Sequence, residues 1–370
     1  MTNIERFERV LRFEPADRLP AIEWAPWWDK TLNRWRFEGL PADLDYFFES
    51  KEYFGLDPLY QLWVPVRDEY CPIYDESGIA MIRNTSDYEA LLPHLYTQKL
   101  LQSIEKNMKE FAETRIPKYA CWFTLDGFFW FPRVLFGIEE HLYAFYDHSD
   151  LMKRINRNLC DYYKKVLEII FHYLKPQFMT FAEDMSYNHG PMISRDLYNE
   201  FMLPYYLELV PMIKEHGTKV FIDTDGFVEP LIPWFKDAGI EGVLPLERMA
   251  GVDVNRIRQN YPDLLMIGGF DKTIMHLGEN AMRAEFERIL PAMKSGGYIP
   301  SVDHQTPPDV SLKTYRIYVR LLKEYVKKQQ NKQETSLRMV YVLKKSTNPN
   351  LPKITTYNLY RTSLDMFIGT

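Results

Sequence analysis

Short apolar runs that end in acidic residues dominate the middle of the sequence, from Phe178 to Glu247. The run FMTFA is followed by Glu183 and Asp184, and the run KVFID leads to a further carboxylate at Asp225. A helix-like stretch separates each run from the next. Short buried strands that alternate with helices are typical of a parallel α/β sheet or barrel, in which the loops after the strands carry the active site.

The same alternation extends over most of the chain, with glycines at several helix ends. We predict strands at 59–66, 119–125, 178–182, 220–222, 242–246, 264–268 and 298–302, and helices at 3–13, 138–146, 150–173, 227–238, 254–261, 281–294 and 312–325. This order favours a (β/α)8 TIM-type barrel behind an N-terminal helical and aromatic segment. An open doubly wound sheet is the alternative, although no GxGxxG motif follows any predicted strand.

The amino-acid composition of the sequence changes near residue 328. The stretch QQNKQETS is polar, and the residues after it are rich in Lys, Thr and Asn without a clear period. We therefore expect residues 1–327 to form the barrel and residues 328–370 to be an appended, flexible tail.

Bulk properties exclude several classes of protein. The chain has a net charge of −6 and no basic stripe, which argues against nucleic acid as a partner. Its three cysteines have no CxxC spacing, so we expect neither a disulfide framework nor an all-cysteine metal site. No signal peptide and no membrane-spanning run is visible. We expect a cytoplasmic enzyme with a small-molecule substrate.

The acidic residues at the strand ends are the first candidates for chemistry. Asp223 and Asp225 are two residues apart and share one face of their strand, so they need a metal, a cation or a shared proton. An Asx-turn and a helix cap are the structural alternative. Glu183 and Asp184 are adjacent and point to opposite faces, so one of them can face the barrel while the other binds loop amides. Glu247 ends a third run, with Arg248 as a possible ion-pair partner.

Two histidines lie in loops after predicted strands. His304 stands in the Pro-containing stretch DHQTPP, where Asp303 can orient its ring. His189 stands in YNHG after the Glu183 strand, close to Tyr187, which can donate a hydrogen bond to a substrate. We take Glu183, Asp184, Asp225 and His304 as the candidate catalytic set, with Glu247, Tyr187 and His189 as substrate-binding candidates.

Two aromatic groups can line a pocket. Trp24, Trp27 and Trp28 cluster in AIEWAPWWDK, where they either cover one end of the barrel or form a wall over a flat or cationic ligand. The strand 119–125 ends at Asp126 and Gly127 and leads into the aromatic loop FFWFPR, which holds Phe128 and Arg133. This arginine can clamp a carboxylate. We include Asp126, Phe128 and Arg133 among the substrate-binding candidates.

Four stretches resemble the uroporphyrinogen decarboxylase (URO-D) superfamily in their order and spacing. They are AEDMSYNHGPMISRDLYNEFMLPY (182–205), KVFIDTDGFVEPLIPWFKDAGIEGVLPLERMAGVD (219–253), LLMIGGFDK (264–272) and GGYIPSVDHQTPPDVSLKTY (296–315); the opening ERFERVLRFEPADRLP (5–20) also fits. The resemblance implies a TIM-type barrel with its site at the carboxyl ends of the strands, and a homodimer.

The superfamily also holds cobamide-dependent methyltransferases. In its thiol-activating members a His-x-Cys pair and a late Cys hold zinc, and the matching positions here are Asp223, Asp225 and His304. The resemblance therefore implies a possible zinc site at these residues and a possible corrinoid carried by a partner protein. True decarboxylases carry an Arg-rich RQAGRY-type motif, whereas the corresponding region here is WAPWWDKTLNRWRF.

The sequence is compatible with three functions. The first is corrinoid-linked methyl transfer that involves a small O- or N-methyl substrate. The second is decarboxylation of a tetrapyrrole, which needs no cofactor. The third is non-catalytic binding of a corrinoid or tetrapyrrole. The acidic rim suits a cationic or neutral substrate better than a polyanion, which favours the first.

Overall fold

A curled sheet of parallel strands forms the centre of the computed structural model, which describes residues 1–44, 49–72, 80–116 and 118–328. Its seven strands lie in the order β1-β2-β3-β6-β7-β8-β9 and are all parallel. They are β1 (Leu59–Trp63), β2 (Ala120–Asp126), β3 (Phe178–Ala182), β6 (Lys219–Asp223), β7 (Gly242–Leu244), β8 (Leu265–Phe270) and β9 (Tyr298–Val302). Neighbours in the sheet are therefore neighbours in the sequence, as the alternating pattern predicts.

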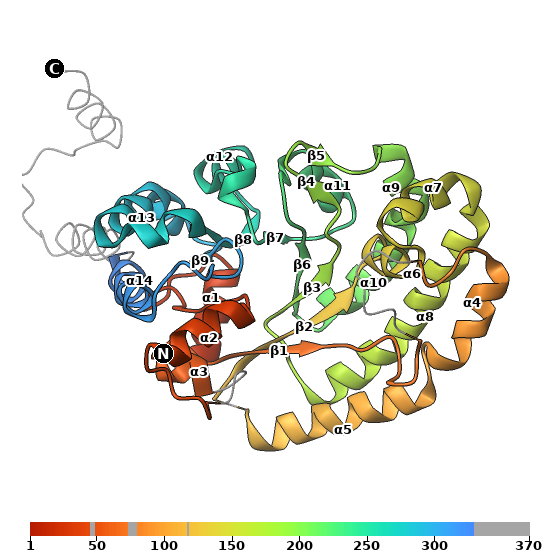
Figure 1. The fold of residues 1–370 in the computed structure, drawn as a ribbon, viewed down its shortest axis with the longest axis horizontal. Coiled ribbons are helices and arrows are strands. Elements are labelled where there is room, and N and C mark those ends of the chain that lie inside the picture. The colour runs from red at the N-terminus through yellow and green to blue at the C-terminus, as the bar shows by residue number, and fades with distance from the viewer. Residues whose placement is uncertain (45–48, 73–79, 117, 329–370) are drawn as a thin grey trace, which may run out of the picture. The chain divides into compact units, whose positions relative to one another are not determined.

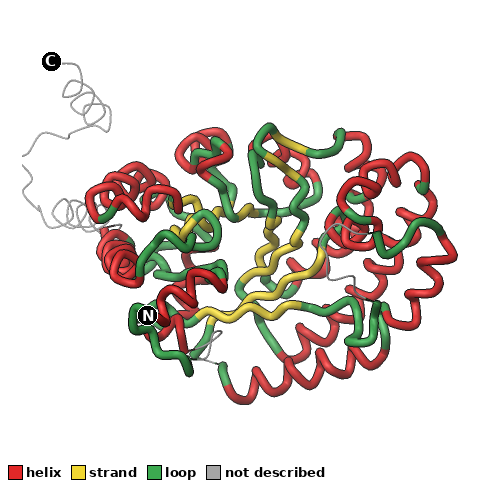
Figure 2. Tube along the Cα trace, in the orientation of Figure 1, coloured by secondary structure: helices red, strands yellow, loops and turns green. Residues whose placement is uncertain are grey.

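Helices surround this sheet (Figure 1), and Figure 2 shows the strands gathered between them. The helices are α1 (Asn3–Leu11), α2 (Asp29–Phe37), α3 (Glu49–Tyr53), α4 (Thr85–Leu91), α5 (Gln98–Thr114), α6 (Trp130–Phe136), α7 (Ile138–Asp147), α8 (Ser149–Tyr173), α9 (Arg195–Phe201), α10 (Leu203–Glu215), α11 (Ile232–Asp237), α12 (Val254–Asn260), α13 (Glu279–Met293) and α14 (Leu312–Tyr325). Among the described helices, none is both long and apolar enough to cross a membrane.

Local sequence explains where several of these helices begin and end. Thr2 and Glu5 form a capping box at the start of α1, and Ser194 caps α9. The helical stretch after Ser194 is divided in two near Pro204, since α9 ends at Phe201 and α10 begins at Leu203. Gly217 then adopts a positive φ of 78° between α10 and β6.

The prediction of an α/β fold with sequential parallel strands is confirmed, but closure into an eight-stranded barrel is not. The extended segment 20–25 lies between β9 and β1 and makes few ladder bonds. Ala21 accepts from the Asp57 backbone N–H at 2.8 Å, and the Trp24 indole donates to the Val302 carbonyl at 2.8 Å. Prolines at 20 and 26 flank the segment and lack N–H donors, which limits its pairing with both neighbours.

The two faces of the sheet have different surroundings. Side chains that point outward are apolar and pack on helices, as Phe123 does on Phe171 of α8 and Phe181 on Tyr206 of α10. Side chains that point inward include Trp122 and Phe178, whose rings stack with centroids 4.9 Å apart. These inward rings fill the lower part of the interior, so any open space lies toward the carboxyl ends of the strands.

The chain divides into two units, Met1–Gln329 and Gln330–Thr370. The second unit lies outside the described residues, and so does the predicted tail apart from Lys328. The buried hydrophobic cluster of the first unit extends from Phe7 to Val326.

Candidate active site

The carboxyl ends of four strands bring together Asp184, Asp225, Glu247 and His304, which we call the acidic rim. These residues follow β3, β6, β7 and β9, and parallel strands end at the same edge of a sheet. The charges of Glu247 and Asp184 both act on Asp225, and that of His304 acts on Glu247. The four side chains, far apart in the sequence, therefore lie within electrostatic range of one another.

Asp225 and His304 form the closest pair across the rim. The Asp225 Oδ2 atom lies 3.5 Å from His304 Nε2, and the His304 ring meets the Trp24 ring edge-on with centroids 6.3 Å apart. Burial, together with the nearby Glu247 and Asp184 charges, raises the pKa of Asp225 to about 7. Burial and the charge of Lys272 lower the pKa of His304. Near neutral pH the pair thus combines a protonatable carboxyl with a neutral imidazole.

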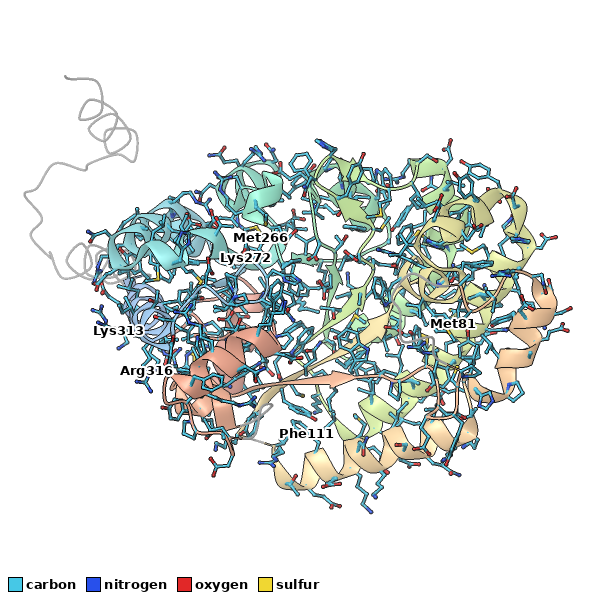
Figure 3. The ribbon with its side chains drawn as sticks, in the orientation of Figure 1. Met81, Phe111, Met266, Lys272, Lys313 and Arg316 are labelled. Atoms are coloured by element: carbon cyan, nitrogen blue, oxygen red, sulfur yellow. The ribbon has the colours of Figure 1, made fainter. Side chains whose placement is uncertain are left out.

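Lys272 organises the adjoining part of the rim. Its ammonium donates to Glu247 Oε1 at 2.9 Å and lies 3.9 Å from Asp303 Oδ1. The other Glu247 oxygen accepts from the Gly226 N–H at 3.0 Å. Burial by itself would raise the pKa of Glu247, but the hydrogen bond and charge of Lys272 outweigh it and the pKa is lowered. Glu247 is therefore a fixed carboxylate, in contrast to Asp225. Figure 3 labels Lys272, which follows β8.

Asp303 does not orient the ring of His304, contrary to the sequence-based expectation. It is fully buried and accepts from the backbone N–H groups of Arg248 at 2.8 Å and Lys272 at 3.2 Å. Because these amides belong to the loops after β7 and β8, Asp303 holds three strand ends together. Burial raises its pKa to about 7.

Arg133 is already engaged with the rim. Its guanidinium donates at 3.2 Å to both the backbone oxygen and the Oδ2 atom of Asp184. Asp184 itself has a positive φ of 45°, which turns the chain sharply after β3. Burial raises the pKa of Asp184 although Arg133 opposes that shift. The predicted clamp for a substrate carboxylate is therefore occupied by a carboxylate of the chain.

Asp223 points into the interior below the rim. Its backbone oxygen accepts from the Glu183 N–H at 2.8 Å, and among the described residues its carboxyl group makes no hydrogen bond or ion pair. Burial and the charges of Asp225 and Asp184 raise its pKa well above the ordinary value for aspartate. Burial also raises the pKa of Asp126, at the end of β2, to about 6.

Glu183 is not available for chemistry, which corrects its prediction as a catalytic residue. Its side chain is fully buried and accepts from three backbone N–H groups, those of Phe128 at 2.8 Å, Phe129 at 2.7 Å and Trp130 at 3.1 Å. Burial raises its pKa to about 8, whereas these three donors favour its ionised form. Glu183 therefore anchors the start of α6.

Most of the predicted aromatic wall belongs to the core. Trp27 is buried among Trp35, Phe54 and Tyr315, and Phe128 is buried against helix α10. Both side chains therefore belong to the hydrophobic core. Trp28 is 43% exposed beside α2, and only Trp24 of the group contacts a rim residue. Of the two predicted roles for these tryptophans, Trp27 therefore fits hydrophobic packing rather than a wall over a ligand.

A short hairpin carries the other two candidates. Strands β4 (Ser186–Tyr187) and β5 (Gly190–Pro191) pair after β3, and the rings of Tyr187 and His189 meet edge-on at 5.6 Å. The Tyr187 carbonyl accepts from the Phe227 N–H at 2.8 Å, which ties the hairpin to the loop after β6. A Cβ atom at Gly226 would meet the Tyr187 backbone at 2.7 Å, so this close approach requires glycine.

The possible zinc ligands do not form a metal site in this arrangement. No group of three or more His, Cys, Asp or Glu side chains in the described part of the chain is placed to hold an ion. Of Asp223, Asp225 and His304, only Asp225 and His304 form a close pair in the described part of the chain. A structural or catalytic zinc centre takes at least three protein ligands. We therefore derive no catalytic step through zinc.

Lys272 is the main site residue that sequence reasoning missed. Lys272 ends the stretch GGFDK, directly after Asp271 and shortly after a predicted strand. The residues of the acidic rim likewise lie in the loops after their strands. Its position after a predicted strand was a signal that could have identified it. Lys272 is a cation, however, whereas the residues chosen at the other strand ends were mostly acidic.

Comparison with known proteins identifies the family. The profile for uroporphyrinogen decarboxylase (URO-D) matches residues 137–325, just over half of the chain. The chain belongs to the uroporphyrinogen decarboxylase family. The match covers the segments that carry Asp184, Asp225, Glu247 and His304, so the acidic rim lies within the family domain. No curated protein sequence matched this chain.

Solved structures support the fold of this URO-D family member. A methyltransferase from Methanosarcina mazei has a TM-score of 0.62 and 14% identity, over 88% of this chain and 99% of that chain. A putative vitamin-B12 independent methionine synthase from Listeria monocytogenes has a TM-score of 0.46 and 11% identity, over 85% of this chain and 98% of that chain. The first likeness shows the fold; the second is too low to carry an argument.

Proposed function

We propose that this URO-D family member catalyses corrinoid-linked methyl transfer from a small O- or N-methyl substrate. The observation that carries the proposal is the Asp225–His304 pair, in which a carboxyl with a pKa of about 7 lies 3.5 Å from an imidazole at the rim. A methyl group leaves oxygen readily only if the departing oxygen receives a proton. Asp225 is placed to supply that proton near neutral pH.

In the proposed step the bond between the methyl carbon and the substrate oxygen or nitrogen breaks, the electron pair stays on that atom, and the atom takes the proton of Asp225. The methyl group bonds to an electron pair of the acceptor. In the proposal the methyl acceptor is a reduced corrinoid carried by a separate protein. His304 borders Asp225 and holds its carboxyl in place, while Glu247 remains ionised beside Lys272. The fixed charge of Glu247 favours the protonated form of Asp225.

The charges at the rim favour this function over tetrapyrrole decarboxylation. The two cations that contact rim carboxylates, Arg133 and Lys272, are paired with Asp184 and Glu247. A polycarboxylate such as uroporphyrinogen would therefore meet acidic groups whose cations are already engaged. A neutral or cationic methyl donor meets no such repulsion. The structural likeness to a methyltransferase from Methanosarcina mazei agrees with this proposal.

The test uses the purified chain and added cob(I)alamin as the probe for the acceptor. We expect loss of the cob(I)alamin absorbance to accelerate when a methoxy or N-methyl donor is supplied together with the protein. Turnover of uroporphyrinogen to a product with fewer carboxylates would overturn the proposal in favour of decarboxylation. Zinc content, measured on the same preparation, tests the metal expectation separately: stoichiometric zinc that is lost in Asp225→Asn would support it.

A further inference from the structure

The interior below the acidic rim contains polar side chains that the proposed proton transfer does not use. Gln61 of β1 donates to the Thr124 hydroxyl of β2 at 2.8 Å, and Thr124 lies 2.9 Å from the Thr180 hydroxyl of β3. These contacts place the three side chains on one face of the sheet. Since Phe123 and Phe181, their outward-facing neighbours, pack on helices, this face is the interior.

One layer closer to the rim, strand register places two carboxyl groups on the same face. Asp126 pairs with Ala182, and Ala182 pairs with Asp223. Asp126 follows Thr124 by two residues, so it points inward as Thr124 does. Two strand spacings separate Asp126 from Asp223, which is roughly 10 Å between their Cα atoms. Ala182, which has a small side chain, lies between them in the sheet.

Solvent reaches this layer from the inside. Asp126, Ala182 and Asp223 are each partly accessible, whereas their outward neighbours Leu125, Phe181 and Ile222 are fully buried. Thr124 and Thr180 in the layer below are also fully buried. The accessible space therefore opens toward the rim and ends on the threonine layer. We call this space the polar well; its lining residues are Gln61, Trp63, Thr124, Asp126, Ala182 and Asp223.

Trp63 gives the well an aromatic edge. It lies two residues after Gln61 on the same face, is 56% exposed, and hydrogen-bonds the Asp126 side chain. Arg67 is the cation that acts on Asp126, whereas among the described residues the charges that act on Asp223 are those of Asp225 and Asp184. An aromatic ring beside carboxylates is an environment that attracts ammonium groups.

We infer that the polar well binds the end of the substrate opposite its methyl group, and that this end carries an ammonium group. The inference rests on the proposed function and narrows its substrate class. Asp223 precedes Asp225 by two residues, so the well lies about 7 Å below the rim along the strand direction. The substrate then stands with its cation between Asp126 and Asp223 and its methyl group beside Asp225 and His304.

Three probes that share a methoxyphenyl group test the inference. They are 4-methoxybenzylamine, which is cationic at neutral pH, 4-methoxybenzyl alcohol, which is neutral, and 4-methoxybenzoate, which is anionic. Titration calorimetry should give the amine an affinity at least about tenfold above that of the alcohol, and no detectable binding of the benzoate. Equal binding of the benzoate and the amine would overturn the inference.

Substitutions test which residues give the amine its higher affinity. Asp126→Asn should reduce the advantage of the amine over the alcohol by about tenfold, because a carboxyl with a pKa of about 6 is ionised at neutral pH. Asp223→Asn should reduce it less, because burial and the neighbouring carboxylates favour the protonated form of Asp223. Ala182→Leu should fill the well and weaken all three probes. Asp196→Asn, an exposed aspartate in the first turn of α9, is the matched control and should change nothing. An undiminished amine preference in folded Asp223→Asn and Asp126→Asn would contradict the assignment.

These binding data separate the inference from the proposed function. If the amine is preferred but no donor methylates cob(I)alamin, the polar well stands and the methyl-transfer proposal fails. If methyl transfer occurs with 4-methoxybenzoate as the best donor, the methyl-transfer proposal stands and the ammonium assignment fails.

Discussion

At the scale of single residues, the protonation state of Asp225 decides whether the proposed chemistry can run. Its pKa of about 7 means that the proton donor is present below that pH and absent above it. We expect the rate of methyl transfer to fall as pH rises through about 7. Lys272→Met should move this fall to higher pH, because the ammonium lowers the pKa of Asp225. Stopped-flow rates between pH 5 and 9 measure both; an unshifted profile in Lys272→Met would contradict the electrostatic account.

Asp223 gives a residue-scale prediction about stability. Its pKa is raised in the folded state, so its contribution to stability is present at low pH and is lost as pH rises through the folded value. Asn cannot ionise, so Asp223→Asn should be more stable than the wild type at pH 8 by at least about 1 kcal/mol, and close to it at pH 4. Urea unfolding at both pH values checks this. A variant that is less stable at pH 8 would show that Asp223 is held by a partner.

Sequence reasoning placed residues better than it assigned their roles. The position of Asp225 and His304 after predicted strands, together with the family resemblance, placed both residues in one candidate site. The roles of Glu183 and Asp303 could not be predicted, because their partners are backbone amides of other strand-end loops. Such contacts depend on loop paths that no local pattern encodes. Asp126 and Asp223 were singled out, but their common layer depends on strand register.

At the scale of elements, the loop after β2 depends on a close fit between Gly127 and Glu183. A Cβ atom at Gly127 would overlap the Glu183 carboxyl group. Gly127→Ala should therefore lower the free energy of unfolding by about 2 kcal/mol, because the buried carboxylate cannot move without losing its three amide donors. Thermal and urea unfolding measure the loss.

A double-mutant cycle controls for other effects of the alanine. In a Glu183→Ala background the same Gly127→Ala change should cost much less, since the overlapping group is gone. An equal cost in both backgrounds would place the strain elsewhere in the loop.

Most strands and helices could be predicted because their patterns are local. The prediction for β3, residues 178–182, coincides with the structure, and the predicted helix 312–325 coincides with α14. Closure of the barrel could not be predicted, because it depends on how the segment 20–25 pairs with two strands distant in the sequence. The role of Trp27 could not be decided from the sequence either, since its core partners come from α2, residue 54 and α14.

At the scale of the whole molecule, the hydrophobic core between Phe7 and Val326 predicts that residues 1–328 fold without the remainder of the chain. A protein truncated after Lys328 should unfold within a few degrees of the full chain and bind the three methoxyphenyl probes with the same affinities. Calorimetric melting and titration check this. A large drop in melting temperature would mean that residues 329–370 contribute to the core.

In the proposed reaction Asp225, beside His304 at the acidic rim, supplies the proton for methyl transfer. The most direct test compares wild type, Asp225→Asn and the control Asp196→Asn in the cob(I)alamin assay at saturating methyl donor. We expect Asp225→Asn to slow transfer at least about a hundredfold while donor affinity is largely kept, and the control to be unchanged. An Asp225→Asn protein that transfers methyl groups at the wild-type rate would contradict this proposal.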